Sequence, residues 1–313
     1  MRGVAAFGII GCHLSLSPRT EAGRLVTALC DFNVGMFAAV AGFLMCWRGA
    51  AGGWLAYVGK RARRLLPLYF IWTVIFLLAT VAFDLLLDGG CLNPRYATAS
   101  FWWRVVFWGG SSAHLWFLIC LFYAQAVLFL GFRLGADRWH GVMWIGLGGL
   151  TISFCALSSE WYAYYPLRLT AFLMTGYGIG CLLQGGMQEV CRRYNVVLWA
   201  GAAVALVTHV LAGTAVRGFV KDWLAVCPVL LAFVGLEVKR EHTMRVAAFL
   251  GATSLGVYLV HPLVTRGLSV AITRMFQPPF SVWIVLGEWV LAWGISLAAV
   301  AVLGWVPGVR RVV

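Results

Sequence analysis

The sequence predicts an all-α integral membrane protein with about ten transmembrane helices and both termini in the cytoplasm. Of its 313 residues, 62% are hydrophobic and only 11% are charged, whereas a soluble domain carries about 25% charged residues. The apolar residues form continuous runs instead of alternating with polar ones, which favours membrane helices over strands. No connection is long enough for a soluble domain, so residues 1–313 are expected to form one polytopic membrane domain without a fused extracytoplasmic domain.

Ten apolar segments account for most of the chain, and several approach the shortest length that spans a bilayer. They cover residues 3–17, 25–47, 65–87, 113–134, 141–157, 167–185, 196–214, 222–236, 246–266 and 281–306. Small residues recur within them, and Gly176 and Gly180 have the spacing that lets helices pack closely in lipid. The nine cysteines include no CxxC pair, which predicts small buried side chains and no metal site.

The net charge of +13 comes from 24 basic and 11 acidic residues, and the basic residues lie between the apolar runs. That distribution favours a charge bias across a membrane over nucleic-acid binding. With both termini in the cytoplasm, fifteen basic residues fall on the inner side and nine on the outer side. The bias predicts that Arg63 and residues 237–245 face the cytoplasm, while Asn93 and Gln277 face outward.

The first segment carries a cation at one end and a titratable ring at the other. Arg2 and His13 are eleven residues apart, so on an α-helix they lie on nearly the same stripe, about 16 Å apart along the axis. That distance is about half the thickness of a bilayer, which suggests a path between two compartments. A signal peptide and a membrane helix with a snorkelling arginine are the alternatives.

Polar residues of several segments are predicted to gather in the outer half of the membrane. His13, His114 and His261 belong to three distant segments and fall at a similar depth when the segments alternate in direction. The same half contains Asp31, Asn33, Arg168 and Glu288. Because ionisable groups at membrane depth normally face a cavity or one another, a shared outward-facing polar cavity is expected. Each histidine could instead cap a helix or lie at the level of the lipid headgroups.

The inner side has a cluster of four bases, Lys60, Arg61, Arg63 and Arg64, directly before the predicted third segment. Such a cluster attracts anionic membrane lipid. It would equally suit the phosphates of a nucleotide cofactor, because arginine binds phosphate bidentately. No glycine-rich phosphate loop is present, so arginines would have to hold the nucleotide.

Five elements in chain order resemble the membrane-bound acyltransferase 3 family, whose members O-acylate cell-surface saccharides. They are Arg2 and His13 with ten residues between them, Phe37 followed by AGFL (41–44), RARRLLPLY (61–69), HLWFL (114–118) and SLGVYLVH (254–261). The resemblance implies a ten-helix, multi-pass protein of a bacterial inner or plasma membrane. It also implies that acyl-CoA binds from the cytoplasm and that the acceptor lies outside.

The resemblance assigns roles to individual residues. It implies that the pair Arg2 and His13 and the pair Arg61 and Arg64 are essential. We expect His13 to act as the general base on a sugar hydroxyl, because imidazole titrates near neutral pH. We expect Arg61, Arg64 and Arg2 to hold the phosphates of the acyl-CoA donor, acetyl-CoA or another acyl-CoA.

Four further residues complete the predicted catalytic set. His114 and His261 are candidates for binding the acceptor or for stabilising the oxyanion. Asp31 or Glu288 could orient His13, and the sequence does not choose between them. Direct transfer and a covalent acyl-enzyme are both open, because no nucleophile stands out in the sequence.

The expected function is O-acylation, most simply O-acetylation, of a cell-surface or lipid-linked saccharide of the cell envelope, without a metal. A transporter or flippase for a glycan precursor is the alternative, since it would use the same helices, basic inner face and outer cavity without making a bond. A membrane sensor or scaffold is a third possibility. Acyl transfer by the purified protein would distinguish the enzyme from both.

Overall fold

The computed structural model describes residues 1–14, 20–48, 53–87, 94–109, 114–131, 138–157, 164–211, 218–236, 241–276 and 280–305. All regular structure in these ranges is helical, without a strand, which confirms the predicted all-α class. The α-helices are α1 (Arg2–Cys12), α2 (Glu21–Cys30), α3 (Asn33–Arg48), α4 (Trp54–Leu87), α5 (Ala99–Arg104), α6 (Trp116–Gly131), α7 (Arg138–Leu157), α8 (Tyr164–Leu182), α9 (Gln188–Arg193), α10 (Asn195–Leu211), α11 (Gly218–Val234), α12 (Glu241–Met275) and α13 (Val282–Leu303). Short helical segments η2 (Pro94–Ala97), η3 (Val105–Gly109) and η5 (Leu183–Met187) join some of them.

Within the described ranges, five helical segments are long and apolar enough to cross a membrane. They are Gly23–Trp47, Trp54–Ala82, Pro166–Arg193, Thr243–Met275 and Val282–Leu303, and α1, α6 and α10 are shorter apolar helices. The chain is therefore a multi-pass membrane protein. Each of the ten predicted segments overlaps a helix, and the segment 25–47 overlaps two. Length and composition support only five crossings, so the count of ten stays a prediction.

Three predicted segment boundaries differ from the structure. Helix α4 begins at Trp54 instead of residue 65, so the basic cluster lies on the helix and not in a loop before it. Helix α12 runs from Glu241 to Met275, well beyond the predicted 246–266, and continues through Pro262. The segment 25–47 is interrupted at residues 31 and 32, between α2 and α3. Hydropathy missed the early start of α4 and the full length of α12 because polar residues on a helix lower the apolar average without ending the helix.

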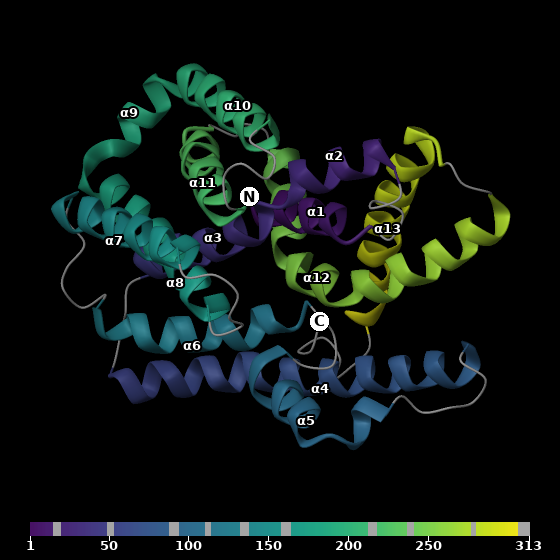
Figure 1. The fold of residues 1–313 in the computed structure, drawn as a ribbon. Helices are drawn as coiled ribbons and strands as arrows, with labels where there is room; N and C mark the ends of the chain where they lie inside the picture. The colour runs from purple at the N-terminus through teal and green to yellow at the C-terminus, as the bar shows by residue number, and fades with distance from the viewer. Residues whose placement is uncertain are drawn as a thin grey trace.

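Helix α1 lies at the centre of the molecule, among α2, α3, α12 and α13 (Figure 1). Its glycines allow this close packing: a Cβ atom at Gly3 would lie 2.6 Å from the Cβ of Leu250 on α12, and one at Gly11 would lie 2.5 Å from the Cys30 sulfur. On the side of α13, Phe7 stacks on Trp289 with 4.5 Å between ring centroids. The indole nitrogen of Trp289 donates to the carbonyl oxygen of Phe7 at 2.9 Å. The amino-terminal helix is therefore a buried core element of the fold.

Helices α3 and α8 are in backbone contact, as the spacing of small residues predicted. A Cβ atom at Gly176 would overlap the carbonyl oxygen of Ala39, and one at Gly180 would lie 2.7 Å from the Cβ of Cys46. Close approach of this kind stabilises helix pairs in lipid, where there is no hydrophobic drive to bring two apolar helices together.

We expect Gly176→Ala to destabilise the protein by about 1–3 kcal/mol, because the added methyl forces the two helices apart. The measurement is the thermal unfolding midpoint of the purified protein in detergent. Gly146→Ala on α7 is the matched control, since a Cβ there meets no atom within 4 Å. Equal midpoints for the two variants would show that the α3–α8 contact does not limit stability.

Candidate active site

Three histidines that are far apart in the sequence form one cluster. His13 follows the end of α1, His114 lies just before α6, and His261 is within α12. The ring centroids of His13 and His261 are 5.3 Å apart, and those of His114 and His261 are 5.7 Å apart. The side chains of His114 and His261 are fully buried. The structure thus brings together the three histidines that the sequence placed at one depth.

The ring of His261 is fixed by one hydrogen bond, which also determines where its proton lies. Its Nδ1 is 2.7 Å from the carbonyl oxygen of Tyr258. A carbonyl oxygen only accepts, so Nδ1 carries the proton and Nε2 of the neutral ring is an acceptor. Among the described residues, the buried Nε2 has no hydrogen-bond partner. This nitrogen is therefore an unused hydrogen-bond acceptor within the cluster.

The surrounding aromatic residues explain why the histidines meet. The hydroxyl of Tyr258 donates to the carbonyl oxygen of His114 and so ties α12 to the start of α6. Phe37 on α3 contacts both Phe117 and Tyr258, with centroid distances of 5.8 and 6.2 Å. The ring of Phe76 on α4 packs against His114 at 4.6 Å. Four helices thereby converge behind the histidine cluster.

Helices α1 and α12 run parallel, from an end that carries Arg2 to an end that carries the histidines. Gly3 faces Leu250 at one end, and His13 faces His261 at the other. The length of α1 therefore separates Arg2 from His13 by about 16 Å, and Arg2 is half-buried. The structure has the predicted helix from Arg2 to Cys12, with His13 directly after its end.

Arg61 and Arg64 lie three residues apart on one face of α4. The Arg61 guanidinium lies over the ring of Tyr57, 5.0 Å from its centroid, and is half-buried. Tyr57 in turn stacks on Phe129 near the end of α6, at 4.2 Å. Arg64 is exposed. Arg61 is therefore held in place by an aromatic stack, whereas Arg64 extends from the helix surface.

The arginines of α4 lie at the end of the bundle opposite the histidines. Helices α4 and α6 are antiparallel, because Tyr57 contacts Phe129 at one end and Phe76 contacts His114 at the other. Fifteen residues of α4 separate Arg61 from Phe76, which is about 22 Å along the axis. Both α1 and α4 thus carry arginine at one level and reach the histidine cluster at the other.

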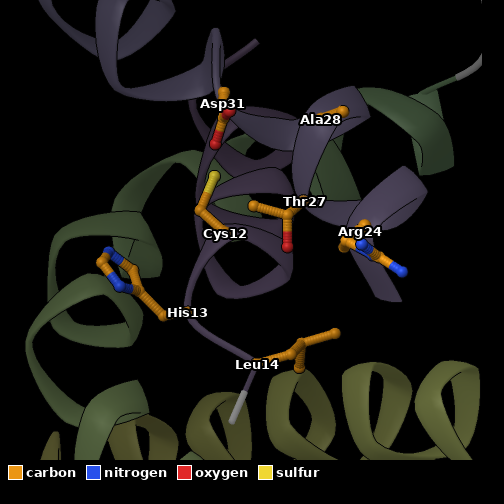
Figure 2. A pocket seen from close by; sticks show the side chains of 7 residues that line it. All are labelled: Cys12, His13, Leu14, Arg24, Thr27, Ala28 and Asp31. Carbon is orange, nitrogen blue, oxygen red and sulfur yellow. The ribbon is translucent and has the colours of Figure 1, made fainter. Parts of the chain in front are cut away.

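Asp31 and His13 line one cavity of about 450 Å³, with Cys12, Leu14, Arg24, Thr27 and Ala28 (Figure 2). No hydrogen bond joins Asp31 to His13 in the described structure, and Figure 2 shows the carboxylate beyond Cys12 from the His13 ring. Glu288 is buried on α13, beside the contact between Trp289 and Phe7. Asp31 is therefore not a direct hydrogen-bond partner of the His13 ring, and the orienting role of Glu288 stays a prediction.

The structure adds a pair that the sequence analysis left unassigned, the buried His209 and the half-buried Asp222. His209 is on α10, and its Nε2 is 2.7 Å from the carbonyl oxygen of Ala28 on α2. Its Nδ1 lies 3.6 Å from a carboxylate oxygen of Asp222 on α11. The available signal was that the two residues border the same predicted outer connection, between segments 196–214 and 222–236.

A family model described as an acyltransferase domain, of the acyltransferase 3 family, matches residues 1–306. The chain belongs to the acyltransferase 3 family. The match runs from α1 to the end of α13, so it includes every candidate residue named above. No curated protein and no solved structure matches the chain.

As a member of this family, the protein is a membrane acyltransferase. The arrangement of its polar residues suits such an enzyme, because the half-buried imidazole of His13 lines a cavity and its ring lies 5.3 Å from the buried imidazole of His261. Neighbouring imidazoles can accept a proton and pass it on. The residues that could bind anionic groups, Arg2, Arg61 and Arg64, stand at the other end of the same helices.

Proposed function

We propose that this acyltransferase moves an acyl group, most simply acetyl, from cytoplasmic acyl-CoA to a hydroxyl of a cell-surface or lipid-linked saccharide. The observation that supports the proposal is the position of the arginines and histidines along α1 and α4. Arginines stand at one end of both helices, and the histidine cluster stands at the other. An extended donor held by its phosphates at the arginine end would direct its thioester toward the histidines.

His13 is the proposed general base. It takes the proton of the acceptor hydroxyl while the hydroxyl oxygen forms a bond to the acyl carbonyl carbon, and the bond from that carbon to the CoA sulfur breaks. His261 suits acceptor binding better than oxyanion stabilisation, because its Nε2 can accept but not donate in the neutral ring. His114, whose backbone is held by Tyr258, is the remaining candidate for the oxyanion.

The donor is proposed to bind at the cytoplasmic end through Arg61, Arg64 and Arg2, whose guanidinium groups match phosphate oxygens. Donor binding at that end implies that both termini lie in the cytoplasm and that successive membrane helices alternate in direction. The parallel pair α1 and α12 and the antiparallel pair α4 and α6 agree with ten alternating passes. Asn93, Gln277 and residues 237–240, named in the predicted topology, lie outside the described residues.

The deciding experiment uses the purified full-length protein with acetyl-CoA and a panel of methyl glycosides. We expect an O-acetylated glycoside by mass spectrometry and an equal amount of free CoA, since each transfer releases one thiol. Protein heated until it has aggregated is the control. Glycoside uptake into proteoliposomes without any acetylated product would contradict the proposal and favour a transporter.

A further inference from the structure

A second cavity, of about 280 Å³, meets the His13 cavity at Asp31, which lines both. Its wall includes Arg168 at the start of α8 and the neighbours Lys221 and Asp222 on α11. Trp116 on α6, two residues after His114, also lines it. The cavity is thus beside the histidine cluster, at the same end of the bundle, and the reaction proposed above makes no use of it.

Two acids and two bases share this small space within an apolar helical bundle. Asp222 interacts electrostatically with Asp31, Lys221 and Arg168. Within the described part of the chain, Asp31 and Lys221 form no direct ion pair, although their charges influence each other. Charged groups at membrane depth are costly, so they pair with one another or mark the pathway of a ligand or ion. Four charged residues that line one cavity, without a direct ion pair between Asp31 and Lys221, suit ligand binding.

His209 lies beside the carboxylate of Asp222, which lines the cavity. The Nε2 of His209 must donate, because the carbonyl oxygen of Ala28 can only accept. The side chain is 1% exposed, and its Nδ1 faces Asp222 without a hydrogen-bond partner among the described residues. The carboxylate therefore faces a buried ring to which it makes no hydrogen bond, and Asp222 also lines the space shared with Lys221 and Asp31.

We propose that this charged cavity binds the sugar ring of the acceptor. Carboxylates accept hydrogen bonds from ring hydroxyls, and arginine and lysine donate to ring and hydroxyl oxygens, in charge-assisted bonds that are stronger than neutral ones. Equal numbers of acids and bases suit an uncharged, polyhydroxylated ligand better than an anion. Trp116 and Phe172 add apolar surface for the face of a sugar ring. The junction at Asp31 would then lead one hydroxyl toward His13.

The inference rests on the proposed function, and its test measures sugar binding without turnover. Saturation-transfer difference NMR of methyl β-D-glucopyranoside, methyl β-D-galactopyranoside and methyl N-acetyl-β-D-glucosaminide is recorded with the full-length protein in detergent. We expect at least one glycoside to bind the wild type and to bind Asp222→Asn and Lys221→Met about ten- to a hundredfold more weakly. Glu189→Gln removes an exposed carboxylate on α9 and should bind as the wild type does.

Each outcome supports or overturns the inference. Equal glycoside affinity in wild type, Asp222→Asn and Lys221→Met, or no binding of any glycoside by the wild type, would overturn it. If loss of the His209 contact prevents Asp222→Asn from folding, Lys221→Met decides alone. Glycoside binding that both variants weaken, in a protein that never transfers acetyl, would support the cavity and refute the proposed enzyme. Acetyl transfer to a glycoside, with the KM for that glycoside unchanged in both variants, would support the proposed enzyme and refute the sugar-binding cavity.

Discussion

His13→Ala should lower acyl transfer by about a hundred- to ten-thousandfold, the cost of losing a general base, while acyl-CoA binding stays nearly intact. The two effects separate because His13 lies about 16 Å along α1 from Arg2, at the end of the bundle opposite the arginines. The variant loses the ring contact with His261 but keeps the rest of the α1 packing, since Gly3, Phe7 and Gly11 precede His13. Product formation and CoA affinity, measured on the same preparation, test both parts.

His13→Gln distinguishes proton transfer from hydrogen bonding. Glutamine keeps a polar amide of similar size but cannot take a proton at neutral pH, so it should be almost as inactive as alanine. His140→Gln on α7 is the matched control, because that ring is outside the histidine cluster. Activity of His13→Gln within about threefold of wild type would exclude His13 as the general base, since the loss expected from that role is far larger.

Arg61→Ala and Arg64→Ala should each weaken acyl-CoA binding by about ten- to a hundredfold, the value of a charge-assisted hydrogen bond of about 1.5–3 kcal/mol. Arg61→Ala should have the larger effect on protein stability, because its guanidinium covers the ring of Tyr57. The acylation rate at saturating donor should change much less than the affinity. Titration of CoA into each purified variant, with calorimetric detection, provides the comparison.

Two further variants separate phosphate binding from general attraction to lipid. Lysine at position 61 or 64 keeps the charge but not the planar donor geometry, so it should restore only part of the CoA affinity. Arg63→Ala removes an exposed charge of the same cluster from a different face of α4 and should change CoA affinity least. Similar losses for Arg61→Ala and Arg63→Ala would indicate that the whole cluster acts only through its charge, as anionic lipid binding requires.

The fold class and the depth of the candidate residues could be predicted from the sequence because lipid imposes strong rules. A segment in the bilayer must satisfy its own backbone hydrogen bonds, so continuous apolar runs become helices. The position of His13, His114 or His261 within its run then gives its level, and the structure brings all three rings together. The beginning of α4 was less predictable, since the basic residues before Pro67 are compatible with either a loop or a helix.

The sequence by itself determined that the chain is helical, apolar and multi-pass, and that arginines and histidines stand at opposite ends of its helices. Only the tertiary structure decided which helices are neighbours, and hence that Asp31 shares one cavity with His13 and another with Asp222, and that His209 contacts Asp222. The physical reason is that hydropathy gives the depth of a residue along the membrane normal. It does not tell which helices lie side by side within the plane of the membrane. Which helices become neighbours depends on how well their surfaces fit, and that fit is decided only when all the helices pack together. Gly176 is an example, because its lack of a side chain lets the backbone of α3 approach.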